Sequence, residues 1–266
     1  MAGSINFGQF VPGTSFLHRL DPRTKIFCCA GLVLASLLAD RPAGFALVSL
    51  VLLLALRLGQ VGWRLLLSFL RPFALILLLS FVLQAFLTPG EKWLAVGPLA
   101  LTREGLYLGG TVLWRLLHIA AFGSLLTLTT SPVRLTAGLE SILKPLARLG
   151  VPVCDVATMI TLALRFVPTL LEEAQEIVRA QQCRGAVFGR GGPVTRLRSL
   201  VSVLVPLFAG AFRRAEDLAT AMEIRCYRGG ANRTRMRELR YAARDGAALA
   251  CTLAVLGAIL CWRWWY

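Results

Sequence analysis

Long apolar tracts separated by short polar segments run through most of the chain. Five of them are predicted to cross a membrane as helices, over roughly 26–40, 43–58, 72–88, 105–130 and 245–262. A crossing takes about 20 mostly apolar residues, so the first two tracts need flanking residues to complete theirs. Because only helices and closed barrels satisfy their backbone inside a bilayer, the pattern predicts an all-α, polytopic membrane helical bundle.

Between the fourth and fifth tracts, the apolar residues follow a helical period instead. They predict three amphipathic helices, over about 131–149, 154–184 and 194–228. In the two longer helices, apolar residues recur at alternating spacings of four and three, and the next position in that register is Arg184 or Arg225. A seam of this period typically packs against another helix, so these two helices can pack against each other. Pro168 is expected to bend the first of them.

The distribution of charge predicts how the helices are oriented. The chain has 29 basic and 14 acidic residues, a formal net charge of +15, and Lys and Arg favour the cytoplasmic segments of membrane proteins. More than half of the basic residues lie in 131–240. The tracts 153–171 and 199–212 are apolar enough to suggest further spans, but a crossing at 153–171 would place several arginines outside. We therefore expect 131–240 to be a cytoplasmic domain apposed to the membrane.

Three parts follow from this orientation. Residues 1–130 are predicted to form an N-terminal membrane domain with four spans, 131–240 the cytoplasmic domain of amphipathic helices, and 241–266 a C-terminal span. The N-terminus is expected in the cytoplasm and the C-terminus outside. The aromatic run from Trp262 to Tyr266 fits this placement, because indole and phenol rings favour the headgroup layer.

Few residues offer catalytic or metal-binding chemistry. The seven cysteines form no C-x-x-C pair, and His18 and His118 are the only histidines, so no metal site or histidine-based catalytic set is expected. A nucleotide-binding P-loop needs Gly-Lys-Ser/Thr, and none of the lysines follows a glycine. No recognition motif accompanies the arginines to indicate nucleic-acid binding. The chain is therefore expected to be neither an enzyme nor a binder of cofactors or nucleic acid.

One ionisable residue lies well inside a predicted span. Arg115 is mid-way along 105–130, and ionisable groups within a membrane are commonly functional. It could belong to a self-contained transporter or channel that acts without an ATPase, or it could bond free carbonyls or a carboxylate of the bundle. The structural role is preferred, because no other full span holds a mid-membrane acid or base for a relay. In the same tract, Gly105-x-x-x-Gly109 could let a helix of a partner protein approach closely.

Several short motifs, in order over residues 15–240, resemble the transmembrane (T) components of energy-coupling factor (ECF) transporters. They are Ser15–Phe27, Thr129–Pro132, Leu164–Pro168 with Glu172, Ala180–Gly185, and Pro206–Gly230 followed by Arg233–Arg235. The family signature is two Ala-Arg-Gly triplets at the ends of two coupling helices, matched here by Cys183-Arg184-Gly185 and Ile224-Arg225-Cys226. Both arginines are kept, whereas the small flanking residues are partly replaced. A side chain at Cys226 is expected to remove any backbone angle that only glycine adopts.

The resemblance implies the transmembrane scaffold of an ECF-type ABC importer. Two cytoplasmic ATP-binding-cassette ATPases would hold ATP and Mg, and a small membrane S component would take up a vitamin or a transition-metal ion. Each signature arginine would meet acidic groups in a groove of one ATPase, with its neighbours Cys183 and Gly185, or Glu223 and Cys226, beside it. Arginine suits such a contact because it is always charged and binds a carboxylate with two parallel bonds. The implied location is the plasma membrane of a prokaryote.

Overall fold

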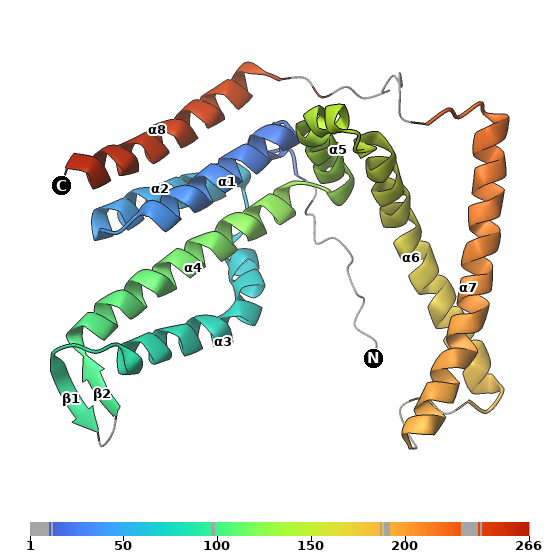
Figure 1. Cartoon of the computed structure of the whole chain (residues 1–266), viewed down its shortest axis with the longest axis horizontal. Helices are drawn as coiled ribbons and strands as arrows, with labels where there is room; N and C mark the ends of the chain where they lie inside the picture. Colours follow the sequence, from blue (N-terminus) through green and yellow to red (C-terminus); the bar gives the residue numbers. More distant parts are fainter. Residues whose placement is uncertain are drawn as a thin grey trace. The chain divides into compact units, whose positions relative to one another are not determined.

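The computed structural model describes residues 11, 13–96, 99–186, 188, 192–229, 239 and 241–265. This part of the chain folds into eight α-helices, one β-hairpin and two short 3₁₀ turns (Figure 1). In chain order they are η1 (Leu17–Arg19), α1 (Pro22–Leu38), α2 (Pro42–Gly59), α3 (Trp63–Leu87), β1 (Lys92–Val96), β2 (Leu99–Thr102), α4 (Arg103–Thr129), α5 (Pro132–Leu143), η2 (Lys144–Leu149), α6 (Val153–Cys183), α7 (Pro193–Ile224) and α8 (Ala243–Trp265). The predicted helical class is confirmed, and the antiparallel hairpin β1–β2 is an addition that the sequence did not predict.

The chain divides into two compact units. The first unit comprises 1–141 and 237–266, and the second comprises 142–236. The division falls within the last turn of α5, whereas the sequence placed the start of the cytoplasmic domain at residue 131. The second unit contains α6 and α7, the two helices that end in the expected coupling arginines. Its position on the cytoplasmic side stays a prediction.

A hydrophobic core joins the helices of the first unit. Helix α1 packs against α8, α4 and α2, so segments from the two ends of the sequence lie side by side (Figure 1). Apolar residues of α1, α2, α3, α4 and α8 meet in one cluster, which includes Leu32, Val48, Leu66, Phe122 and Ile259. The start of α1 is fixed by Asp21, whose carboxylate accepts a hydrogen bond from the Arg23 N–H over 2.9 Å. This capping bond explains why the helix begins at Pro22, before the apolar tract.

Glycines on α4 bring α3 and α4 into close contact. A Cβ at Gly105 would lie 2.8 Å from the backbone oxygens of Gln84 and Ala85, and one at Gly109 would lie 3.2 Å from that of Phe81. The close approach that was expected for a helix of a partner protein is therefore made by α3 of the same chain. The prediction of an external partner at this motif is wrong, because the α3–α4 hairpin itself fills the groove.

Helix α3 begins earlier than the apolar pattern predicts. The third span was expected over 72–88, but α3 starts at Trp63 and continues through Pro72. Arg64 and Arg71, which precede the expected span, therefore lie on the helix. The arginines interrupt the apolar run without ending the helix, because arginine is a good helix former.

Six described helices are long and apolar enough to cross a membrane, namely α2, α3, α4, α6, α7 and α8. Helix α1 has 17 residues, which agrees with the expectation that the first tract is short. Helices α6 and α7 qualify by length and composition alone, although the charge distribution assigns them to the cytoplasm. The five-span topology is therefore a prediction that needs a measurement of sidedness.

Candidate functional site

Helix α6 ends at the first expected coupling arginine. Arg184 directly follows the helix, and Gly185 after it has a left-handed backbone with a φ of 87°. The Gly185 N–H donates to the Gln182 carbonyl over 3.0 Å, and the Ala186 N–H donates to the Gln181 carbonyl over 2.9 Å. These two bonds make up the Schellman motif that ends many helices. They fix the backbone on which Arg184 is presented.

Helix α7 ends in the same geometry. Arg225 directly follows the helix, and Cys226 takes the left-handed position with a φ of 56°. The Cys226 N–H donates to the Glu223 carbonyl over 2.9 Å, and the Tyr227 N–H donates to the Met222 carbonyl over 3.0 Å. The expectation that a side chain at 226 removes this backbone angle is wrong. The two capping bonds hold a conformation that costs a residue other than glycine about 1–2 kcal/mol.

The side chains at both helix ends are open to other molecules. Every expected coupling residue is exposed in the structure, namely Cys183, Arg184, Gly185, Glu223, Arg225 and Cys226. Among the described residues, no ion pair engages the guanidinium group of Arg184 or Arg225. Each guanidinium therefore keeps the donor fork that fits a carboxylate. The coupling role of these residues stays a prediction.

Helices α6 and α7 cross at a polar contact away from their ends. Arg214 Nη2 donates to Glu173 Oε2 over 3.0 Å, and both side chains are half-buried. Gly210 allows the approach, since a Cβ there would lie 2.6 Å from Glu173 Oε1. Arg184 is eleven residues beyond Glu173, and Arg225 is eleven residues beyond Arg214, which is about 16 Å along each helix. Figure 1 shows these two helix ends at opposite ends of the crossed pair, so the two arginines form two separate sites.

The apolar seams of the two helices are only partly covered. On α7, Leu197 is 64% exposed and Phe208 is 58% exposed, and on α6, Val156 and Ile160 are also exposed. As expected, the two helices pack against each other around the Glu173–Arg214 pair, whereas the first halves of both seams lie exposed. Each helix consequently presents an apolar face that the second unit does not cover.

Arg115 links α4 to the turn between α1 and α2. Its Nη2 donates to the Ala39 carbonyl over 3.0 Å and lies 3.5 Å from Asp40 Oδ1, and its Nε donates to the Ser36 carbonyl over 3.4 Å. These carbonyls and this carboxylate are the partners that the structural role requires. The geometry therefore favours that role over a proton or ion relay. Pro168 lies within α6, and the helix continues on both sides of it.

A buried polar cluster at the start of α1 was not anticipated from the sequence. The Asp21 N–H donates to Asp245 Oδ1 over 2.8 Å, which ties α1 to α8. Lys25 Nζ donates to the Thr129 carbonyl over 2.9 Å and to Thr130 Oγ1 over 3.1 Å, which ties α1 to the end of α4. The motifs Ser15–Phe27 and Thr129–Pro132 thus meet in space. The polar residues of these two motifs are the only sequence signal of this cluster, and their spacing does not reveal that they meet.

These features define a class of protein before any comparison is made. The chain is a helical, multi-pass membrane protein with two basic helix ends exposed for contact with other molecules. Within its described residues, no group of three or more His, Cys, Asp or Glu side chains could hold a metal ion. The exposed arginines and the apolar helix faces indicate a subunit that works through partner molecules.

Comparison with known proteins gives the family. The family model for the cobalt transport protein CbiQ matches residues 13–236. The energy-coupling factor transporter transmembrane protein EcfT of Thermosediminibacter oceani is 48% identical over 257 residues, which is 96% of this chain and 97% of the relative. The EcfT proteins of Acidaminococcus fermentans and Brevibacillus brevis are 42% and 40% identical over 264 residues, which is 99% of this chain. The chain belongs to the CbiQ family, as a non-catalytic transmembrane component of an energy-coupling factor transporter.

Proposed function

We propose that this chain couples ATP hydrolysis by two partner ATPases to uptake of a substrate through a small membrane S component. The observation that carries the proposal is the matched pair of helix ends. Each presents an exposed arginine at the end of a long helix, followed by the same left-handed cap. Two equivalent contacts suit two equivalent ATPase subunits, with one arginine entering an acidic groove on each.

The crossing of α6 and α7 gives these contacts a mechanical connection. Helices of this length behave as stiff rods, and the Glu173–Arg214 pair joins them at a point equally far from both arginines. When ATP binding moves the two ATPases relative to each other, each arginine moves with its own subunit. The crossed helices then change their relative angle, and this change moves the apolar faces that the two helices present.

The exposed apolar faces of α6 and α7 provide the surface that receives this movement. Leu197, Leu204 and Phe208 follow one face of α7, and all three are exposed. Such a face is stable against the bilayer or against a membrane-embedded S component, because both remove it from water. In this account the S component determines which substrate is carried, and that substrate is a vitamin or a transition-metal ion. This chain contacts the S component but not the substrate.

The remaining assignments follow from the same account. ATP and Mg bind the ATPases, since this chain has no P-loop lysine. The location is the plasma membrane of a prokaryote, with the N-terminus and residues 131–240 in the cytoplasm, where the ATPases are. Basic residues are concentrated in 131–240, as expected for a cytoplasmic segment.

Uptake and ATP hydrolysis measured on the same variants test the proposal. In the assembled transporter, Arg184→Ala and Arg225→Ala should each reduce uptake per ATP hydrolysed, because one helix no longer follows its ATPase. Arg179→Ala on α6 and Arg198→Ala on α7 are matched controls, since both side chains are exposed and lie on the same helices. Uptake that continues after removal of all ATPase subunits would contradict the proposal and favour the self-contained transporter.

A further inference from the structure

The start of α1 contacts the chain on both sides of the segment that carries α6 and α7. The chain leaves the first unit after Ser141, near the end of α5, and returns to it at Arg237, shortly before α8. Two peptide connections therefore join the second unit to the first. The short segment Asp21–Lys25, all of it within the first unit, holds the residues next to both connections.

Two contacts hold the outgoing connection. Lys25 is buried, and its Nζ donates to the Thr129 carbonyl over 2.9 Å and to Thr130 Oγ1 over 3.1 Å. These bonds fix the residues just before α5. Within α5, a Cβ at Gly138 would lie 2.9 Å from Pro22 Cβ, so this helix packs directly on the start of α1. The path to the second unit is thus held before and within α5.

Asp245 holds the returning connection. It is only 2% exposed, and its two carboxylate oxygens accept hydrogen bonds from different segments. Oδ1 accepts from the Asp21 N–H over 2.8 Å, and Oδ2 accepts from the N–H of Ala242, the residue before α8, over 2.8 Å. The Arg23 guanidinium also lies 5.4 Å from the centre of the Tyr241 ring, a cation–π contact. Because a buried charge must be hydrogen-bonded to be stable, Asp245 keeps α1 and the start of α8 together.

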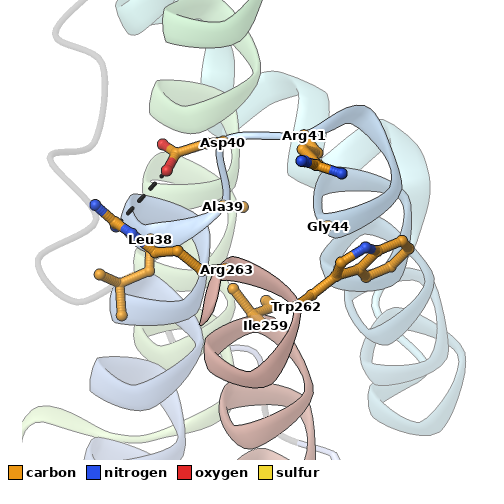
Figure 2. Close-up of a pocket in the computed structure, with 8 residues that line it drawn as sticks. All are labelled: Leu38, Ala39, Asp40, Arg41, Gly44, Ile259, Trp262 and Arg263. Carbon is orange, nitrogen blue, oxygen red and sulfur yellow. Dashed lines mark ion pairs between the residues drawn. The ribbon is translucent and has the colours of Figure 1, made fainter. Parts of the chain in front are cut away.

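The opposite end of α8 has a weaker link to α1. Figure 2 shows the ion pair there, in which Arg263 Nη1 lies 3.7 Å from Asp40 Oδ2. Both side chains are more than half exposed, and exposed pairs contribute little to stability. Helix α1 has 17 residues and is therefore about 25 Å long. The buried attachment of α8 to α1 thus lies only at the end that leads to the second unit.

We propose that the Asp21–Lys25 segment and Asp245 form an anchor that holds both connections of the second unit at one place on the membrane unit. When the ATPases move α6 and α7, the anchor makes these helices move relative to the spans, whereas loose connections would absorb the displacement. Networks of packed and hydrogen-bonded residues can carry such coupling. Asp245 is accordingly a positioning residue. This inference rests on the proposed function, because it assumes that ATPases drive α6 and α7.

Distance measurements between spin labels on the assembled transporter test the anchor. The transporter is purified with its ATPases and S component, and each distance is measured without nucleotide and with Mg-ATP and vanadate. Labels are attached to cysteines introduced at exposed positions of an otherwise cysteine-free chain. Arg179→Cys with Arg213→Cys reports the movement of α6 relative to α7. Arg57→Cys with Arg179→Cys reports the movement of α6 relative to the span α2.

Asp245→Asn should separate the two movements. An asparagine offers one acceptor oxygen where the carboxylate offers two, so either the Asp21 N–H or the Ala242 N–H loses its partner. In the unaltered transporter, ATP should shift both distances. In Asp245→Asn, the α6–α7 shift should remain, whereas the α6–α2 shift should be lost and its distance distribution should broaden. Tyr241→Leu should reduce the α6–α2 shift, and Tyr241→Phe should restore it because the ring over Arg23 is kept.

Two variants of the first unit are matched controls. Arg263→Gln releases the opposite end of α8 from α1 and should leave both shifts unchanged. Gly109→Leu overpacks the α3–α4 contact, which lowers the stability of the same unit without touching the anchor. It should also leave both shifts unchanged, so it distinguishes loss of the anchor from general destabilisation.

The α6–α2 shift decides between the outcomes. An equal shift in Asp245→Asn and the unaltered chain would overturn the anchor and leave the proposed function standing. Loss of the shift in Gly109→Leu as well would also overturn it, because the effect would then follow stability. If Asp245→Asn does not assemble, the comparison of Tyr241→Leu with Tyr241→Phe decides. No response of either distance to ATP in the unaltered transporter would contradict the proposed function, and the anchor with it.

Discussion

A cysteine at the end of α7 occupies the backbone geometry that a glycine occupies at the end of α6. Gly185 takes its φ of 87° without steric cost, whereas Cys226 holds a φ of 56° with its Cβ close to the backbone. Cys226→Gly should therefore stabilise the end of α7 by about 1 kcal/mol. Amide hydrogen exchange of the Tyr227 N–H, which closes this cap, should slow accordingly.

The reciprocal variant Gly185→Cys is the matched control. It should destabilise the α6 cap by a similar amount and speed exchange of the Ala186 N–H. Unchanged or faster exchange at Tyr227 in Cys226→Gly would contradict the interpretation that the cap is strained.

The amino-acid sequence predicts the positions of the two arginines but not the backbone conformation of the caps that follow them. The apolar register leads directly to Arg184 and Arg225, because it depends only on spacing. The left-handed angle at Cys226 could not be predicted from residue type, since two capping hydrogen bonds outweigh the preference of the side chain. The Asp21–Asp245 bond joins residues 224 positions apart, and no local pattern reveals a contact of that range.

At the scale of elements, the α3–α4 hairpin offers a test in two adjacent residues. Gly109 faces α3 closely, whereas a Cβ at Gly110 would meet nothing within 4 Å. Gly109→Leu should lower the free energy of unfolding by about 1–3 kcal/mol, the usual effect of overpacking. Gly110→Leu, with the same change in volume one residue away, should have little effect. Denaturant unfolding in detergent measures both, and equal destabilisation would exclude close packing at Gly109.

Most helices could be predicted from their apolar period, but what covers their apolar faces could not. The expected ranges of α2, α4, α6 and α8 agree with the structure to within a few residues. The seams of α6 and α7 can also be predicted, yet their first halves lie exposed. Periodicity defines which face is apolar, whereas the geometry of the crossing depends on Gly210 and the Glu173–Arg214 pair.

At the scale of the whole molecule, the native cysteines can determine the sidedness of α6 and α7. If both helices lie in the cytoplasm, Cys183 and Cys226 are on the same side of the membrane. If both helices cross, the two cysteines are on opposite sides. Both side chains are exposed, so variants that retain only one of them can be labelled with a membrane-impermeant thiol reagent.

The charge distribution predicts protection of both cysteines in intact cells and labelling of both after permeabilisation. Labelling after permeabilisation also shows that the cysteine is not shielded from the reagent by a bound protein. Labelling of Cys183 from outside intact cells would contradict the cytoplasmic placement of 131–240 and would make α6 a span.

The central claim is that Arg184 and Arg225 each bind one ATPase subunit, and retention of ATPase by the purified complex tests it most directly. Removing one partner of a buried charge pair costs roughly 2–5 kcal/mol, or about thirtyfold or more in affinity. Arg184→Glu and Arg225→Glu should each reduce the retained ATPase, and the double variant should retain none. Arg179→Glu and Arg198→Glu should retain as much as the unaltered chain, since exposed pairs contribute about 0–1 kcal/mol. A double variant that retains as much ATPase as these controls would show that the arginines are solvated helix-end charges.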